Sequence, residues 1–328
     1  MPPLRILSAD DVKAALPMRQ AIDAMRLAFG QLSAGQATMP QRAVLNTEQG
    51  LNLFMPAYLT GSRDLALKIV SVYGDNPARG LPLIMALVTV LDAETGAPLA
   101  VMDGTYLTAL RTGAASGLAT ELLARPGADV VALFGAGGQA RAQLEAVCTA
   151  RQVRVVRVYT RTPKHAQSFA AGVAGQGPIP PAVSAAPSPE AAVRGASIIV
   201  AATTSSRPVF DGTLVEPGTH VNGVGSFRPD MQEIDAALVR RARVVVDQRA
   251  AAWEEAGDLI IPVEQGLITP DHIHAELGEI VNGAKPGRES DQEITFFKSV
   301  GVAAQDAAVA GRILQAAAAH DLGTLVEM

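Results

Sequence analysis

The sequence predicts an α/β protein in which a Rossmann-type parallel sheet is joined to a smaller α+β domain. Two observations favour this fold class. From Arg111 onward, apolar β-rich stretches alternate with helical stretches, which is typical of βαβ units and a parallel sheet. In the first hundred residues, short β-rich stretches are broken by Gly, Pro and Asp, which indicates an antiparallel sheet.

The first domain is expected to begin with a helix and to continue as a sheet. Apolar residues recur at helical spacing between residues 8 and 35, and Ser8 is a suitable N-cap. The strand-like stretches that follow are AVLNT, LNLFMPAYL, DLALKIVSVYG and LIMALVTVLDAETGAPLAVMDG. Near the end of the chain, VGVAAQDAAVAGRILQAAAAHDL predicts a long apolar helix that packs back on this domain.

The second domain is expected to alternate between helices and strands. The helical stretches are RTGAASGLATELLA, GQARAQLEAVCTA and TPKHAQSFAAGV. The strands are DVVALFG, VRVVRVYT, SIIVAATT, HVNGVG and ARVVVDQ. A sheet assembled from such units is parallel, and its ligands bind at the carboxyl ends of the strands.

Composition and charge exclude several classes of protein. The chain has 328 residues, of which 48% are hydrophobic and 18% charged, as expected for a globular protein of two domains. A net charge of -5 offers no general attraction to nucleic acid. The longest apolar run, residues 81–91, is too short to cross a bilayer, and the N-terminal sequence lacks a signal-like apolar core. We therefore expect a cytoplasmic protein without a membrane partner.

No metal or thiol site is expected. Cys148 is the sole cysteine and lies in an apolar helical stretch, which favours a packing role. His272 and His274 are two positions apart, so we interpret them as surface residues rather than metal ligands. The sequence also lacks a G-x-S-x-G elbow, which leaves hydrolysis without a nucleophile.

A glycine motif follows the strand VVALF and precedes a helix. Gly135, Gly137 and Ala140 form the pattern G-x-G-x-x-A, and Gly138 and Gln139 complete the turn. The first glycine permits a tight turn, the second lets the backbone approach a pyrophosphate, and the alanine keeps helix and strand close. The helix N-terminus offers unpaired N–H groups to the anion. The alternative is a glycine turn without a ligand.

The choice of cofactor depends on the end of the next strand. No carboxylate stands there to bind the ribose hydroxyls of NAD; instead the sequence is Thr160, Arg161, Thr162. The Arg161 guanidinium suits a 2′-phosphate, so NADP is favoured and NAD remains possible. The alternative is that Arg161 is a solvated loop residue.

Three cations stand out in apolar surroundings. Lys68 lies within LALKIVSVY, where a buried ammonium needs a reason. Arg111 stands at the junction of the two domains, and Arg42 precedes the strand AVLN. Each has an ordinary alternative, because strand lysines can point to solvent and arginines can bind the C-termini of helices.

Six ordered motifs resemble the ornithine cyclodeaminase/mu-crystallin family. They are LALKIVSVYGDNPARGLP, LTALRTGAASGLAT, GAGGQA, VYTRT, NGVGSFRPDMQEID and FFKSVGVAAQD. The resemblance implies a homodimer that binds an amino or imino acid against a nicotinamide. It also implies a substrate-binding and dimerisation domain of residues 1–113 with 303–328, and a dinucleotide-binding domain of residues 114–302.

The resemblance also implies roles for individual residues. The family's carboxylate-binding cations match Arg42, Lys68 and Arg111. The residues that it places near the cofactor, beyond the glycine motif and Arg161, are Thr112, Thr162, Thr203, Val224 and Ser299. Asp306 in the last helix is expected to be a structural hydrogen-bonding or capping group, with a supporting role behind the site left open.

The sequence departs from the ornithine-deaminating branch of that family. Phe227 stands where that branch carries an acid, and Asp230 is expected to face elsewhere. Leu53 replaces a second acid on an early strand. A distal substrate ammonium would thus be buried without a partner, which disfavours ornithine. Together with Met55, Phe227 suggests a pocket for an apolar ring, as in the family's ketimine reductases.

We therefore expect reduction of a small cyclic ketimine carboxylate, Δ1-pyrroline-2-carboxylate or Δ1-piperideine-2-carboxylate. Arg111 and Arg42 would hold the carboxylate, and Lys68 a hydrogen bond at the imine nitrogen. Three alternatives remain. They are ornithine cyclodeaminase, an alanine or N-alkyl amino acid dehydrogenase, and a protein that binds NADPH and a small ligand without turnover.

Overall fold

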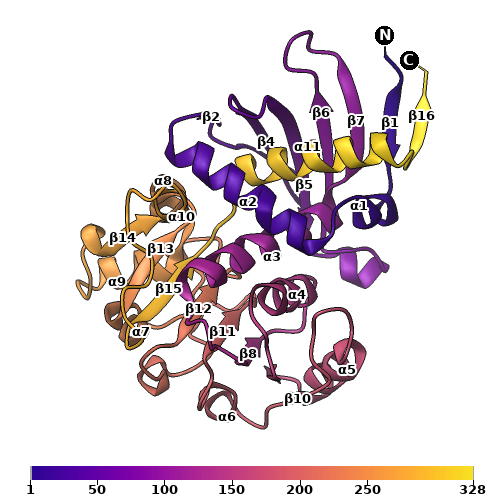
Figure 1. Cartoon of the computed structure of the whole chain (residues 1–328). Helices are drawn as coiled ribbons and strands as arrows, with labels where there is room; N and C mark the ends of the chain where they lie inside the picture. Colours follow the sequence, from indigo (N-terminus) through magenta and orange to yellow (C-terminus); the bar gives the residue numbers. More distant parts are fainter. Residues whose placement is uncertain (1, 328) are drawn as a thin grey trace. The chain divides into compact units, whose positions relative to one another are not determined.

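The computed structural model describes residues 2–327, which form two compact units (Figure 1). The first unit comprises residues 2–111 and 302–327, and the second comprises residues 112–301. The last helix therefore belongs to the first unit, as the sequence predicts, although the whole second unit separates it along the chain from the elements of residues 2–111. The mixed and parallel sheets of the two units confirm the α/β fold class.

The first unit is a sheet with helices packed on it. Its strands are β1 (Leu4–Leu7), β2 (Ala37–Thr38), β3 (Ala43–Asn46), β4 (Gly50–Leu59), β5 (Asp64–Tyr73), β6 (Ile84–Leu91), β7 (Pro98–Asp103) and β16 (Thr324–Val326). Its helices are α1 (Ala9–Ala15), α2 (Met18–Ser33), the short η1 (Asn76–Arg79) and α11 (Ala303–Ala319). The strand order is β16-β1-β7-β6-β5-β4-β2, with β3 paired to β4. Because β1 runs parallel to β7, the sheet is mixed, and the expectation of a wholly antiparallel sheet was wrong.

The N-terminal helix is divided in two where a single helix was expected. Ser8 caps α1 as predicted, and it forms a capping box with Asp11. Leu16 then adopts an extended backbone, with φ of -136° and ψ of 94°. The cause is Pro17, because a proline ring disfavours the helical conformation of the residue before it.

One face of the first sheet is buried and carries Lys68 together with apolar side chains of the neighbouring strands. Met55 on β4 lies opposite Lys68 on β5, and Lys68 lies opposite Val88 on β6, so the three side chains share a face. Helix α11 crosses β4, β5 and β6 on this side (Figure 1). The buried alternation of β4 and β5 thus places a lysine beneath a helix, rather than in solvent.

The second unit is a parallel sheet with helices along its connections. Its strands are β8 (Val130–Phe134), β9 (Val155–Tyr159), β10 (Val183–Ala185), β11 (Ile198–Ala201), β12 (His220–Gly223), β13 (Ala242–Val246), β14 (Ile273–Glu276) and β15 (Ile294–Lys298). Its helical elements are α4 (Ala140–Ala150), α5 (Pro163–Val173), α6 (Pro189–Val193), η2 (Gly212–Leu214), α7 (Ala236–Arg241), α8 (Arg249–Glu255), α9 (Gly257–Glu264), η3 (Pro270–His272) and α10 (Leu277–Val281). Helix α3 (Gly104–Leu123) begins seven residues before the expected Arg111.

The strand order of this second sheet is β10-β9-β8-β11-β12-β15-β13-β14. Chain order reverses between β8 and β11, which in doubly wound sheets marks the crevice where ligands bind. Strand β8 is buried on both faces: Ala132 and Phe134 join one apolar cluster, and Val131 and Leu133 join the other. The fully buried β15 is not among the strands that the sequence pattern predicts.

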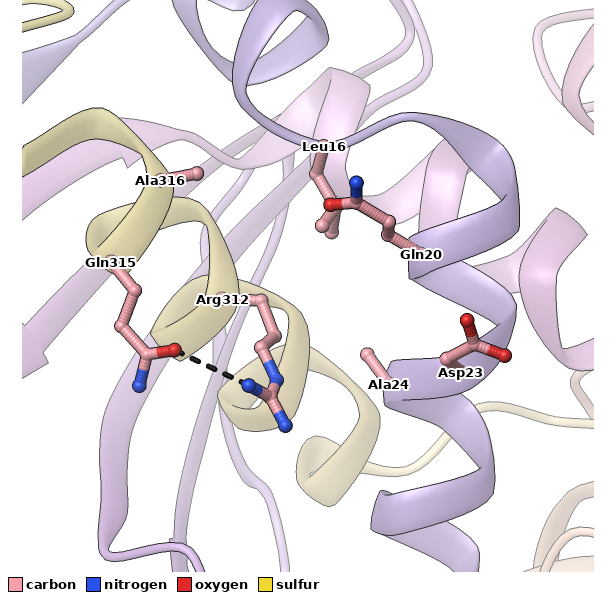
Figure 2. A pocket seen from close by; sticks show the side chains of 7 residues that line it. All are labelled: Leu16, Gln20, Asp23, Ala24, Arg312, Gln315 and Ala316. Carbon is pink, nitrogen blue, oxygen red and sulfur yellow. Dashed lines mark hydrogen bonds between the residues drawn. The ribbon is translucent and has the colours of Figure 1, made fainter. Parts of the chain in front are cut away.

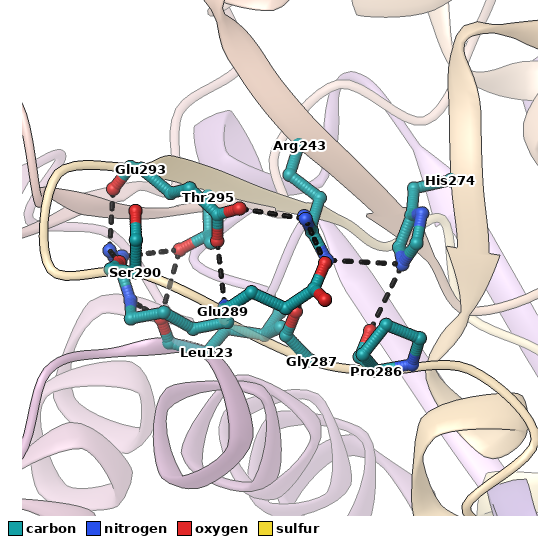
Figure 3. A network of polar contacts seen from close by, with 10 residues as sticks. Leu123, Arg243, His274, Pro286, Gly287, Glu289, Ser290, Glu293 and Thr295 are labelled. Atoms are coloured by element: carbon teal, nitrogen blue, oxygen red, sulfur yellow. Dashed lines mark hydrogen bonds and ion pairs between the residues drawn. The ribbon is translucent and has the colours of Figure 1, made fainter.

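A polar network fixes the segment before β15 (Figure 3). Arg243 pairs with Glu289 and Glu293, and it donates to the Gly287 carbonyl oxygen over 2.8 Å. His274 contacts the Pro286 carbonyl oxygen at 3.0 Å. This histidine therefore has a structural contact, and within residues 2–327 no cluster of His, Cys, Asp and Glu could hold a metal ion. In the same range, no helix is both long and apolar enough to cross a membrane.

Candidate active site

A buried cluster of charges lies beneath α11 in the first unit. The Lys68 Nζ is 2.6 Å from Asp306 Oδ2, and the Arg111 Nε is 3.1 Å from Asp306 Oδ1. Arg111 also donates through Nη1 to Gln305 Oε1 over 2.8 Å. Lys68 and Asp306 are each 1% exposed and Arg111 is 6% exposed. One carboxylate thus serves two buried cations.

Local structure explains why these groups meet. Lys68 faces inward because it shares the buried face of β5 with Ala66 and Val70. Asp306 lies in the first turn of α11, where the Gln305 side chain accepts from the Val302 amide over 2.9 Å. The sequence predicts a structural or capping group at Asp306 and leaves a supporting role behind the site open; in the structure Asp306 is the shared counter-ion of Lys68 and Arg111.

The cluster carries an excess of positive charge. Burial lowers the pKa of the Lys68 ammonium to about 8, and the Arg111 charge adds to this effect against the attraction of Asp306. The charge of Arg42 lowers the same pKa further, so this half-buried arginine lies close enough to act on Lys68. The two buried cations Lys68 and Arg111 with one carboxylate are suited to an added anion, because an excess of buried charge is costly until it is paired.

Apolar side chains adjoin these cations on the same sheet face. Met55, directly opposite Lys68 in the register, is 5% exposed. Leu53 lies two positions earlier on β4, opposite Val70. The structure therefore brings Arg42, Met55, Lys68 and Arg111 into one neighbourhood.

The glycine motif of the second unit forms the predicted strand-to-helix turn. Gly135 has a φ of +104°, a conformation that L side chains rarely adopt. A Cβ atom there would lie 2.4 Å from the Ala202 carbonyl oxygen. At Gly137 and Gly138 a Cβ atom would meet nothing within 4 Å, so the backbone there is open to a ligand. Helix α4 begins with the buried Ala140 and has no side-chain cap, so its first amides suit an anion such as a pyrophosphate.

The other predicted cofactor residues of the second unit gather at one edge of its sheet. Register pairs the last residues of successive strands, and these residues are Tyr159, Phe134, Ala201, Gly223 and Lys298. The predicted residues that lie one to three positions beyond these strand ends are Arg161, Thr162, Thr203, Val224 and Ser299. Arg161 and Thr162 are exposed, whereas Ser299 is buried and donates to Asp247 Oδ2 over 3.0 Å. Thr112 lies within α3, and its neighbour Gly113 is close to the first turn of α4, since a Cβ atom on Gly113 would lie 2.5 Å from the Ala142 carbonyl oxygen.

The loop after β12 contains Phe227 and Asp230, one of the two places where the sequence is predicted to depart from the deaminating branch. Phe227 is 40% exposed there. Asp230 pairs with Arg228 through two contacts of 3.0 Å, and a hydrogen bond from that guanidinium lowers the pKa of the carboxyl. Asp230 is thus held at an exposed position by a neighbour on its own loop.

Sequence reasoning missed a second buried charge cluster, in the second unit. Glu233, Asp258 and Lys298 are each 0% exposed, and Lys298 Nζ is 2.9 Å from Asp258 Oδ2. Burial and the neighbouring Asp258 raise the pKa of Glu233 to about 7. One signal was available: Lys298 ends the apolar stretch ITFFK, just as Lys68 stands within an apolar strand.

One groove of the first unit is separate from the cation cluster. It has a volume of about 350 Å³ and lies between α2 and the later turns of α11 (Figure 2). Arg312 and Gln315 line one side and Asp23 the other. Arg312 is about 9 Å farther along the helix axis than Asp306. The cation cluster is the better candidate for the active site, because the groove lacks a buried charge.

Comparison with known proteins places the chain in a class. It belongs to the ornithine cyclodeaminase/mu-crystallin family, whose model matches residues 4–321, and this confirms the resemblance seen in the motifs. Among curated relatives, a Δ1-pyrroline-2-carboxylate reductase of Bacillus cereus is 41% identical over 325 residues, covering 98% of this chain and 99% of the relative.

Two solved structures share the fold over nearly the whole chain. Thermococcus litoralis Δ1-pyrroline-2-carboxylate reductase, in complex with NADH and L-proline, superposes with a TM-score of 0.93 at 42% identity, covering 98% of this chain and 99% of that one. An archaeal alanine dehydrogenase dimer with bound NAD gives a TM-score of 0.92 at 38% identity, covering 99% of each chain.

Proposed function

We propose that this protein is an oxidoreductase that uses NAD(P)H to reduce a small cyclic ketimine carboxylate to the corresponding cyclic amino acid. Δ1-Pyrroline-2-carboxylate and Δ1-piperideine-2-carboxylate are the substrates that fit best. The observation that carries the proposal is the buried cluster of Lys68, Arg111 and Asp306, with Arg42 close by. Its excess positive charge suits a substrate with one carboxylate and one imine.

The cations divide the work of binding. Arg111 and Arg42 would hold the substrate carboxylate, since guanidinium groups bind carboxylates through parallel hydrogen bonds. The Lys68 ammonium has three N–H donors, of which one suffices for Asp306. Another can pass its proton to the imine nitrogen, which leaves Lys68 as a neutral amine and gives an iminium whose carbon is prepared for attack. When bound, the reduced nicotinamide supplies the hydride to that carbon.

Asp306 would support this arrangement from behind. It keeps Lys68 and Arg111 in fixed positions, and it offsets part of the cost of burying two cations. Because its carboxylate is already shared by two cations, it is not available to a third positive group on the substrate. With Leu53 and Met55 beside the cluster, a distal ammonium would lie unpaired. This supports a ring or aliphatic chain over ornithine.

The glycine turn supports a nicotinamide dinucleotide as the cofactor. Gly137 and Gly138 leave room for a pyrophosphate, and α4, whose N-terminus has no side-chain cap, begins directly after this turn. Within this proposal we favour NADP, because the exposed Arg161 follows β9 and no carboxylate stands between β9 and α5. NAD remains the alternative, and the two solved relatives contain NADH and NAD.

We further propose that the protein is a cytoplasmic homodimer. The sheet face opposite Lys68 exposes apolar residues in adjoining strands: Leu45 is 57% exposed, Met85 38% and Leu87 42%. A second copy would cover this face. The archaeal alanine dehydrogenase is a dimer of the same fold. The free and buried thiol of Cys148 is consistent with a reducing compartment.

Steady-state oxidation of NADPH and NADH tests the proposed activity. The purified protein is mixed with each cyclic imine, with ornithine, and with pyruvate plus ammonia. The proposal predicts rapid turnover with at least one imine and little with ornithine. Turnover that requires pyruvate and ammonia would favour the alanine dehydrogenase alternative, which the archaeal relative makes the second candidate. Cofactor binding without oxidation by any substrate would point to a binding role.

A further inference from the structure

Glu233 joins two loops at the carboxyl edge of the second sheet. Its Oε1 atom accepts from the Thr203 amide over 2.5 Å, in the loop after β11. Its Oε2 atom accepts from the Gly225 and Ser226 amides over 2.6 Å and 3.0 Å, in the loop after β12. A single buried carboxylate thus ties together backbone segments that follow two neighbouring strands.

The two loops are in close contact at this point. A Cβ atom on Gly225 would lie 2.1 Å from the Thr203 carbonyl oxygen and 2.6 Å from Glu233 Oε1. No side chain larger than glycine fits between the loops while the carboxylate bridges them. The three amides are satisfied only by Glu233 among the hydrogen bonds that we find in residues 2–327. The bridge therefore sets the spacing of the loops.

Other buried charges hold Glu233 in place. Asp258 Oδ1 accepts from the backbone amides of Glu233 and Ile234 over 2.6 Å and 2.9 Å. Lys298 Nζ pairs with Asp258 Oδ2 and also donates to the Ser226 carbonyl oxygen over 2.5 Å. Two acids and one lysine at 0% exposure are costly to bury, and the backbone donors offset this cost only in this geometry.

The position of the bridge along the sheet indicates what it serves. Thr203 and Gly225 follow β11 and β12, on one side of the reversal in strand order, whereas Arg161 follows β9 on the other side. A dinucleotide bound across such a reversal has its two halves on opposite sides of it. If the adenosine half lies toward β9, where Arg161 stands, the nicotinamide half lies toward β11 and β12.

We propose that Glu233 is a positioning residue for the nicotinamide half of the cofactor, because its carboxylate fixes the backbone of Thr203 and of Gly225–Ser226. The inference rests on the proposed function. Glu233 touches neither substrate nor cofactor in this role. It acts through the two loops, and Lys298 and Asp258 act through Glu233.

Cofactor binding by the Glu233→Gln protein tests this role. The amide keeps the shape of the side chain but turns an NH₂ group toward backbone N–H donors, so one loop contact is lost. Affinity for the preferred reduced dinucleotide should fall about tenfold or more. Affinity for ADP-ribose, or its 2′-phosphate if NADP is preferred, should stay within about twofold because this ligand lacks nicotinamide.

Asp235→Asn is the matched control variant. Asp235 also accepts two backbone amides, those of Gly212 and Leu238, but it caps α7 and joins neither loop. Its dinucleotide affinity should match that of the unsubstituted protein. An equal loss of both ligands in Glu233→Gln, or no loss of either, would overturn the inference. If the unsubstituted protein binds neither ligand, the proposed function itself fails, which is a distinguishable result.

A pH series on the unsubstituted protein gives a second readout that needs no variant to fold. Asp258 from α9 and Lys298 from β15 are the charged groups that act on Glu233, and burial with Asp258 raises its pKa to about 7. The protonated acid loses an acceptor, so reduced dinucleotide should bind more weakly as the pH falls from 8 to 6, and ADP-ribose should not. Glu233→Gln should remove this difference. A constant ratio of the two affinities across this range would contradict the inference.

Discussion

Replacement of Asp306 by asparagine should both destabilise the protein and make it more responsive to carboxylates. Asp306 is 1% exposed and pairs with Lys68 at 2.6 Å and with Arg111 at 3.1 Å. Removal of one partner from a buried ion pair costs about 3–5 kcal/mol, because the remaining charge lies uncompensated. Asparagine keeps one acceptor oxygen for Arg111, so we expect about 3 kcal/mol for Asp306→Asn. Urea unfolding followed by circular dichroism measures this loss.

The second part of the prediction concerns an added anion. Pyrrole-2-carboxylate, a planar carboxylate of substrate size, should raise the thermal midpoint of the Asp306→Asn protein more than that of the unsubstituted protein, because the ligand supplies the missing negative charge. Asp23→Asn is the control: Asp23 pairs with Arg19 at the surface, where such pairs contribute about 0–1 kcal/mol. A loss in Asp306→Asn no larger than in the control would refute the cluster's electrostatic role. An equal rise in thermal midpoint with pyrrole-2-carboxylate in the Asp306→Asn protein and in the unsubstituted protein would also refute this role.

Three further predictions concern the proposed chemistry. Lys68→Met should lower kcat/KM about 10²-fold to 10⁴-fold. Because the protonated ammonium is the donor and its pKa is about 8, kcat/KM of the unsubstituted protein should fall as the pH rises above that value; full activity at pH 10 would argue against this role. Gly135→Ala places a Cβ 2.4 Å from the Ala202 carbonyl oxygen at a φ of +104°, so calorimetry should show loss of dinucleotide binding, with a stability loss of about 1–3 kcal/mol. Arg161→Ala should raise KM for NADPH about tenfold and leave KM for NADH unchanged, and a matching rise for both would remove the assignment.

Much of the second unit follows from local sequence signals. The glycine motif, the β-rich stretches and the helical stretches between them each depend on neighbouring residues, and they predict the turn at Gly135 and the parallel sheet. The strand β15 is not predicted by these local signals. Its five residues are all buried and give no alternation, and it enters the sheet between β12 and β13, far from its neighbours in sequence.

The candidate site divides in the same way. Lys68 can be selected from sequence because a lysine in an apolar strand requires a partner. The identity of that partner cannot be predicted from sequence, since Asp306 lies on a helix that follows the entire second unit along the chain. Only the packing of α11 on β5 brings Asp306 to Lys68. The role of Glu233 is harder to predict, because its hydrogen-bond donors are backbone amides. Every residue except proline has a backbone amide, so no residue type indicates these donors.

The most direct test of the central claim follows the transferred hydrogen. The protein is incubated separately with Δ1-pyrroline-2-carboxylate and Δ1-piperideine-2-carboxylate, together with reduced cofactor that carries deuterium at the transferable C4 position, and the products are analysed by mass spectrometry and NMR. We predict that at least one imine gives its cyclic amino acid, proline or pipecolate, with one deuterium at C2, the carbon that formed the C=N bond. Neither product under conditions where the cofactor binds, or a product without deuterium at C2, would contradict ketimine reduction at this site.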